Sequence, residues 1–64
     1  MNVIKALQIV RDENAPHDEF IGALEYIQMY REGECVVHYC SILGDYVYIE
    51  LDEQTIRYLD LLVV

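Results

Sequence analysis

Residues 35–51 constrain the fold more than any other part of the chain, because they predict a β-hairpin. On both sides of Gly44-Asp45 the chain is rich in the β-branched and aromatic residues that fit a pleated sheet. Gly44-Asp45 is the only turn signal in this stretch, and glycine at the first central position suits a two-residue type II′ turn. A loop of that length pairs Leu43 with Tyr46 and sets the register of the whole hairpin.

The register that follows from this turn assigns every hairpin residue to one of two faces. The expected pairs are Leu43 with Tyr46, Ile42 with Val47, Ser41 with Tyr48, Cys40 with Ile49, Tyr39 with Glu50, and His38 with Leu51. Directly opposed residues share a face, and faces alternate along a strand. One face is mainly aliphatic and is expected to face the core, with Val36, His38, Cys40, Ile42, Val47, Ile49 and Leu51. The other is amphipathic, with Cys35, Val37, Tyr39, Ser41, Leu43, Tyr46, Tyr48 and Glu50.

The amphipathic face is the first candidate contact surface, because it gathers Tyr39, Tyr46 and Tyr48 beside Glu50. Tyrosine combines a large rigid contact area with a polar tip and is enriched at protein interfaces. The alternative is that this face is partly exposed without a role, or is covered by another part of the same chain. A lone two-stranded hairpin is only marginally stable, so a packing partner is expected for each face.

The N-terminal segment predicts a helix over residues 2–14, with Asn2 as its N-cap. A β-strand over residues 3–10 is the alternative, because this stretch also holds several good strand formers. Residues 12–15 form a polar break before the next predicted element.

A second helix is predicted from Pro16 to about Glu32, with Pro16 at the first helical position, where its missing N–H does no harm. Gly33 is expected to end this helix in a left-handed turn. Asp18, Glu25 and Glu32 recur every seven residues and so lie near one line along the predicted helix. This acidic ridge is the second candidate contact surface, which would face a basic groove, and a solvated helix face is the alternative.

The segment after the hairpin predicts a third helix to about Leu62, because Asp52 is a good N-cap and acidic residues follow it. A third β-strand over residues 53–64 is the alternative. Residues 61–64 are all apolar, and their burial within the subunit or across a dimer is expected. The predicted fold is a single α+β domain, residues 1–64, in the order α-α-β-β-α, with helices over the aliphatic face of the hairpin.

The chain carries 12 Asp and Glu against 4 Lys and Arg, a formal charge of −8. This charge disfavours direct contact with nucleic acid or anionic lipid, and it favours a basic protein partner. No apolar run approaches the roughly 20 residues that span a bilayer, so no membrane segment is expected. Two cysteines are too few for a disulfide scaffold and suit a reducing cytoplasm.

No catalytic, cofactor or metal site is predicted. His38 and Cys40 share a face, but they lie roughly 6–7 Å apart along a strand, which is long for a nucleophile–base hydrogen bond. Neither a C-x-x-C nor an H-x-x-x-H pair is present to bind a metal. A chain this small is also expected to lack a pocket of roughly several hundred Å³.

These properties predict a small acidic protein-binding module, an inhibitor or adaptor that docks on a larger cytoplasmic protein and is not an enzyme. Small size and high negative charge are typical of phage- or mobile-element-encoded proteins that block host enzymes or defence systems. One alternative is a nucleic-acid mimic, whose carboxylates occupy a basic groove on a nucleic-acid-handling protein. Another is a self-assembling structural subunit, a homodimer joined through the tyrosines or the apolar C-terminus.

Overall fold

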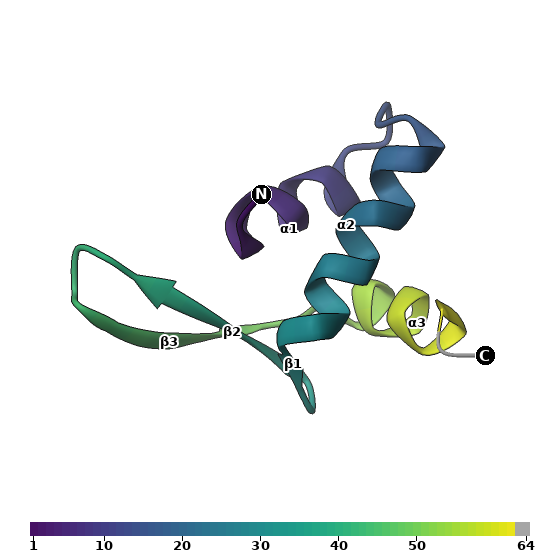
Figure 1. Ribbon diagram of the computed structural model, residues 1–64. Coiled ribbons are helices and arrows are strands. Elements are labelled where there is room, and N and C mark those ends of the chain that lie inside the picture. Colours follow the sequence, from purple (N-terminus) through teal and green to yellow (C-terminus); the bar gives the residue numbers. More distant parts are fainter. Residues whose placement is uncertain (63–64) are drawn as a thin grey trace.

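The computed structural model describes residues 1–62, which form three helices and a three-stranded antiparallel sheet (Figure 1). The elements are α1 (Val3–Arg11), α2 (His17–Tyr30), β1 (Arg31–Glu32), β2 (Cys35–Cys40), β3 (Asp45–Glu50) and α3 (Glu53–Leu62). The α+β class is confirmed, and the order is α-α-β-β-β-α because the short strand β1 precedes the hairpin. The alternative of a third strand near the C-terminus is wrong, since α3 is helical.

Helix α1 begins as predicted, because Asn2 caps it: its side-chain Oδ1 accepts the backbone N–H of Lys5 at 2.8 Å. The helix ends earlier than predicted, with Asp12 in an extended conformation. The Asp12 Oδ1 accepts the N–H of Asn14 at 2.9 Å, a local turn that competes with further helix. The helical prediction for this segment is confirmed, and the alternative strand over residues 3–10 is wrong.

Helix α2 differs from the prediction at both ends. Pro16 is its N-cap rather than its first helical residue, since its ψ of 147° is extended. At the other end the chain turns extended at Arg31, whose Nε donates to the Gly33 carbonyl at 2.8 Å and whose guanidinium pairs with Asp60 of α3 at 2.9 Å. Gly33, with φ +62°, therefore lies in the β1–β2 turn and does not cap the helix.

Strands β2 and β3 form the predicted hairpin with a different register. The loop holds four residues, 41–44, instead of two, and Tyr39 pairs with Tyr46 instead of Glu50. Every predicted partner is thus displaced by four positions. Because four is even, the paired residues stay on the faces to which the sequence assigned them.

The hairpin loop removes residues that were assigned to the sheet. Ile42 was expected on the core face, but it lies in the loop and is 94% exposed. Leu43 is exposed as well. Gly44 completes the loop with φ +67°, a conformation that suits glycine, and its N–H donates to the Cys40 carbonyl at 2.8 Å.

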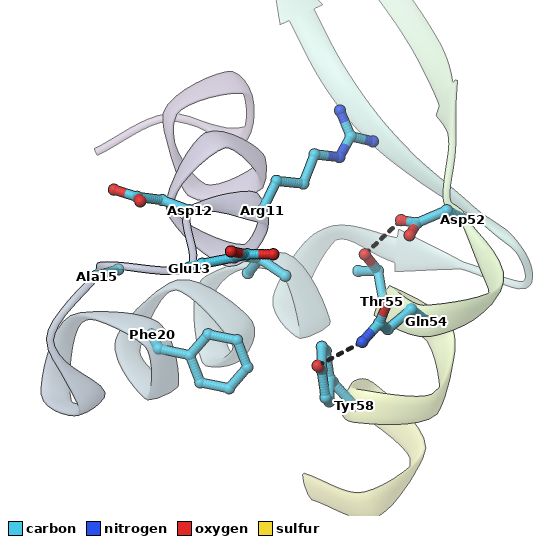
Figure 2. Close-up of a pocket in the computed structure, with 10 residues that line it drawn as sticks. Arg11, Asp12, Glu13, Ala15, Phe20, Asp52, Gln54, Thr55 and Tyr58 are labelled. Carbon is cyan, nitrogen blue, oxygen red and sulfur yellow. Dashed lines mark hydrogen bonds between the residues drawn. The ribbon is translucent and has the colours of Figure 1, made fainter.

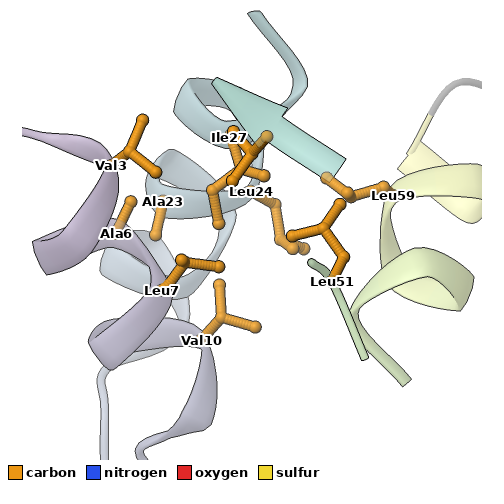
Figure 3. Close-up of a cluster of buried hydrophobic side chains, with 10 residues drawn as sticks. Val3, Ala6, Leu7, Val10, Ala23, Leu24, Ile27, Leu51 and Leu59 are labelled. Atoms are coloured by element: carbon orange, nitrogen blue, oxygen red, sulfur yellow. The ribbon is translucent and has the colours of Figure 1, made fainter. Parts of the chain in front are cut away.

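The hydrophobic core lies between the helices and the base of the hairpin (Figure 3). Its buried members are Val3, Ala6, Leu7, Val10, Ala23, Leu24, Ile27, Val36, Leu51 and Leu59. Only Val36 and Leu51 of the predicted aliphatic face are fully buried, while His38, Cys40, Val47 and Ile49 are partly exposed. The far half of the hairpin extends away from the helices (Figure 1), so the aliphatic face contacts the core mainly at its base.

At the C-terminus, Leu61 is 72% exposed, contrary to the expected burial, and Leu62 is half-buried. Burial was expected for residues 63 and 64 as well, but these two lie outside the described residues. Within residues 1–62, each helix is too short or too polar to traverse a bilayer.

Candidate functional site

The outer face of the sheet brings most of the predicted contact residues together. This surface, called the tyrosine face below, consists of Glu32, Cys35, Val37, Tyr39, Tyr46, Tyr48 and Glu50. The strand pairing arranges these residues in three rows. Glutamates flank Cys35 in the row at the hairpin base, Val37 lies opposite Tyr48 in the next, and Tyr39 lies opposite Tyr46 in the row nearest the loop.

The three tyrosines of this face are open to solvent: Tyr39 is 53% exposed, Tyr46 64% and Tyr48 66%. The rings of Tyr39 and Tyr46 meet edge to face with centroids 5.2 Å apart, a geometry that aromatic pairs prefer. This ring contact follows from the four-residue loop, because the predicted two-residue loop would have placed Glu50 opposite Tyr39. Two of the three exposed tyrosines on this face therefore form one aromatic pair.

The predicted acidic ridge is divided in the structure. Asp18 lies in the first turn of α2, Glu25 lies near the middle of that helix, and Glu32 lies in β1. All three are exposed, but the early end of α2 means that they do not share one line along a helix. Glu32 instead joins the tyrosine face, where it stands across Cys35 from Glu50.

Two further tyrosines extend the aromatic surface onto α2. Tyr26 and Tyr30 line a groove of about 330 Å³ together with Tyr39 and Tyr46. The remaining lining residues are Asn2, Val3, Val37 and His38. The signal in the sequence was the spacing of four residues between Tyr26 and Tyr30, which places them on one helix face, but their position beside the hairpin depends on tertiary packing.

The Tyr26 and Tyr30 rings have centroids 5.1 Å apart. Desolvation raises the pKa of Tyr26, and the neighbouring Tyr30 hydroxyl raises it further. Tyr26 is therefore a neutral phenol at physiological pH, able to donate or accept a hydrogen bond at the wall of the groove.

A second concavity, which the sequence did not predict for so small a chain, opens between the α1–α2 loop and α3 (Figure 2). It has a volume of about 450 Å³. Phe20 and Tyr58 form part of its wall, with ring centroids 5.2 Å apart and an edge-to-face angle of 85°. Arg11, Asp12, Glu13 and Asp52 supply charge of both signs around it.

Two of the acidic groups of this cleft, Asp52 and Asp12, already have structural roles. Asp52 accepts a hydrogen bond from the buried Thr55 hydroxyl in the first turn of α3. This hydrogen bond lowers the pKa of the Asp52 carboxyl, against a smaller opposing effect of desolvation, and the positive charge of Arg11 lowers it further. The Asp12 carboxylate is likewise engaged by the backbone of Asn14. These two carboxylates thus stabilise the start of α3 and the α1–α2 loop.

His38 and Cys40 share the inner face of the hairpin, as predicted, and both are partly exposed. Cys35 lies on the opposite face, and both cysteines are free thiols. Within residues 1–62, no group of three His, Cys, Asp or Glu side chains is arranged to hold a metal ion.

Comparison of the chain with protein-family models, curated proteins and solved structures found no match.

Proposed function

We propose that this chain is a non-catalytic protein-binding module that docks on a larger protein through the tyrosine face, acting as an inhibitor or adaptor. The observation that carries this proposal is the exposure of Tyr39, Tyr46 and Tyr48 on one continuous face of a projecting hairpin. Tyrosines of this kind supply much of the binding energy at protein interfaces, because each buries a large rigid surface at small entropic cost.

The charges around the face favour a basic partner. Glu32 and Glu50 border the tyrosines, and residues 35–50 contain no Lys or Arg. An arginine of the partner can stack on a tyrosine ring while its guanidinium pairs with a neighbouring carboxylate. The net charge of −8 would also accelerate encounter with a basic surface.

The proposal is tested by comparing partner capture by the parent chain, Tyr48→Ala and Leu61→Ala. Leu61 is the control, because it is 72% exposed and lies on α3, away from the tyrosine face. Each tagged chain is incubated with lysate of the producing cell or its host, and captured proteins are quantified by mass spectrometry. We expect one stoichiometric partner that Leu61→Ala retains and that Tyr48→Ala captures about tenfold less well.

Equal capture by both variants would contradict docking through the tyrosine face. Repeating the capture at high salt separates the alternatives. A nucleic-acid-handling partner that is lost at high salt would favour mimicry of nucleic acid, because such contacts are strongly salt-dependent. Recovery of the bait alone, together with a dimer in light scattering, would favour self-assembly.

A further inference from the structure

Strand β3 has an open edge. The strand order is β1-β2-β3, so β3 pairs with β2 on one side and with no other strand among residues 1–62. An open edge carries a row of backbone N–H and C=O groups that can pair with a strand from another chain.

The hydrogen-bond pattern shows which residues present these groups. The Leu51 N–H donates to the Glu34 carbonyl at 2.9 Å, and these two residues continue the β2–β3 register by one pair. In an antiparallel ladder, hydrogen-bonded pairs alternate with pairs that are not hydrogen-bonded. Asp45, Val47 and Ile49 therefore direct their backbone groups toward β2. The alternate residues, Tyr46, Tyr48 and Glu50, direct theirs toward the open edge. The Tyr46 N–H already donates to the Asp45 Oδ1 at 2.7 Å, so the N–H groups open to a partner strand are those of Tyr48 and Glu50.

This edge lacks three of the features by which proteins prevent strand addition, namely a lysine, a proline and a β-bulge. Residues 45–50 contain no lysine and no proline, and their pairing with β2 is uninterrupted by a bulge. The outward backbone groups belong to the same residues whose side chains form part of the tyrosine face. A strand that paired with β3 would consequently place its own side chains beside Tyr46 and Tyr48.

We propose that the open edge of β3 receives an extended basic segment of the partner as an additional antiparallel strand, an inference that rests on the function proposed above. The segment would carry Lys or Arg opposite Glu50 and Asp45, which stand at the two ends of β3. Small β-branched residues would lie opposite the tyrosines, and apolar residues would lie opposite Val47 and Ile49.

Charge complementarity selects this occupant over a second copy of the chain. Pairing between the β3 strands of two copies would bring together two molecules that each carry a net charge of −8. It would also place the carboxylates of Asp45 and Glu50 from both chains along the same pair of strands. Like charges in directly opposed or adjacent strand positions are destabilising.

The test uses a synthetic peptide, Arg-Val-Thr-Val-Thr-Lys, as the probe and an acidic control, Glu-Val-Thr-Val-Thr-Glu. Each is titrated into ¹⁵N-labelled protein while amide shifts and hydrogen exchange are recorded by NMR. A second protein carries an N-methyl group on the Tyr48 backbone, introduced by chemical ligation at Cys40. This change removes one outward N–H, keeps the tyrosine side chain, and leaves the groups that pair with β2 intact. Tyr48→Ala is the complementary variant, because it keeps the N–H and removes the ring.

We expect the basic peptide to bind saturably and to protect the amides of Tyr48 and Glu50. The acidic peptide and the N-methylated protein should each bind about tenfold more weakly. No binding of the basic peptide, or equal binding of the two peptides, would overturn the proposal. Protection of these amides that appears without peptide and increases with protein concentration would identify a second copy as the occupant and would also overturn it.

The two modified proteins separate this inference from the proposed function. If Tyr48→Ala weakens binding and N-methylation does not, the tyrosine side chains bind and strand addition is wrong. If N-methylation weakens binding and Tyr48→Ala does not, strand addition stands and docking through the tyrosine rings fails.

Discussion

Ile27 and Ile42 are the same residue type in one small chain, yet Ile27 is 0% exposed and Ile42 is 94% exposed. The first lies in α2, at the centre of the helical core, and the second lies in the loop at the far end of the hairpin. The contrast shows that the helices cover the hairpin only at its base. The outer half of the hairpin, with its tyrosines and open edge, contributes little to the core and is available for contact.

A small domain is expected to show a sharp division between a buried core and an uncovered region. A chain of 64 residues buries a smaller fraction of its surface than a larger domain does. The core of this protein uses α1, α2, α3 and the residues Val36 and Leu51. The apolar side chains of the outer hairpin therefore lie outside that core and remain exposed.

The largest expected effect distinguishes the two isoleucines. Ile27→Ala removes a fully buried side chain and should reduce the free energy of unfolding by about 2–5 kcal/mol, enough to unfold much of so small a domain. Ile42→Ala, the matched control, should change it by less than about 0.5 kcal/mol. Urea denaturation followed by circular dichroism measures both. Similar losses for the two variants would show that the hairpin loop packs in the folded protein.

Replacing a glycine by alanine should change the free energy of unfolding in opposite directions in α2 and in the hairpin loop. Gly22 lies in α2, and an added Cβ would meet no atom within 4 Å, so Gly22→Ala should stabilise the protein by about 0.5–1 kcal/mol. Gly44 has φ +67°, so Gly44→Ala should destabilise it by about 1 kcal/mol. Thermal unfolding of both variants checks the signs, and a stabilising Gly44→Ala would contradict the loop conformation.

The Asp52 carboxylate should make stability depend on pH. Its folded-state pKa is lowered below the ordinary value of 3.8, so the folded protein binds fewer protons than the unfolded chain in acid. The stabilisation is present above that ordinary value and is lost as the pH falls through the lowered pKa. Asp52→Asn, which cannot titrate, should lose less stability than the parent between neutral pH and about pH 2.

Urea titrations of both proteins at several pH values measure this difference. Asp52→Ala removes the cap as well and should cost about 1 kcal/mol at neutral pH. An acid profile of Asp52→Asn that matches the parent would show that this carboxylate does not stabilise the start of α3.

The smallest expected effect lies on the tyrosine face. Tyr48→Phe removes only the hydroxyl of an exposed side chain, and it should change the free energy of unfolding by less than about 0.5 kcal/mol. Equilibrium unfolding of this variant and the parent provides the comparison. A loss of more than about 1 kcal/mol would show that the face is part of the folded core rather than a contact surface.

The sequence predicted the helices and the two faces of the hairpin well, because both depend on local periodicity. The faces remained correct despite the wrong turn, since the register error was an even number of residues. The loop was mispredicted because Ile42 and Leu43 are good strand formers, and no local feature excludes them from the sheet.

Features that depend on distant residues could not be predicted in this way. Strand β1 has two residues and exists through its pairing with β2, and the contacts of Arg31 with Gly33 and Asp60 help to hold it there. The groove beside Tyr26 and the cleft beside Phe20 require knowledge of how the helices pack. The open edge of β3 likewise becomes visible only when the strand order is known.

The most direct test of the open, contact-ready hairpin is amide hydrogen exchange along β3, measured by NMR over a series of protein concentrations. The structure predicts alternation: the amides of Val47 and Ile49 should exchange slowly, because they pair with β2. Those of Tyr48 and Glu50 should exchange rapidly at every concentration, because they face the open edge. The Tyr46 amide is left out of this comparison, because it donates to the Asp45 Oδ1. Uniform slow exchange along β3 at all concentrations would contradict the account, since it would mean that another part of the same chain already covers this edge.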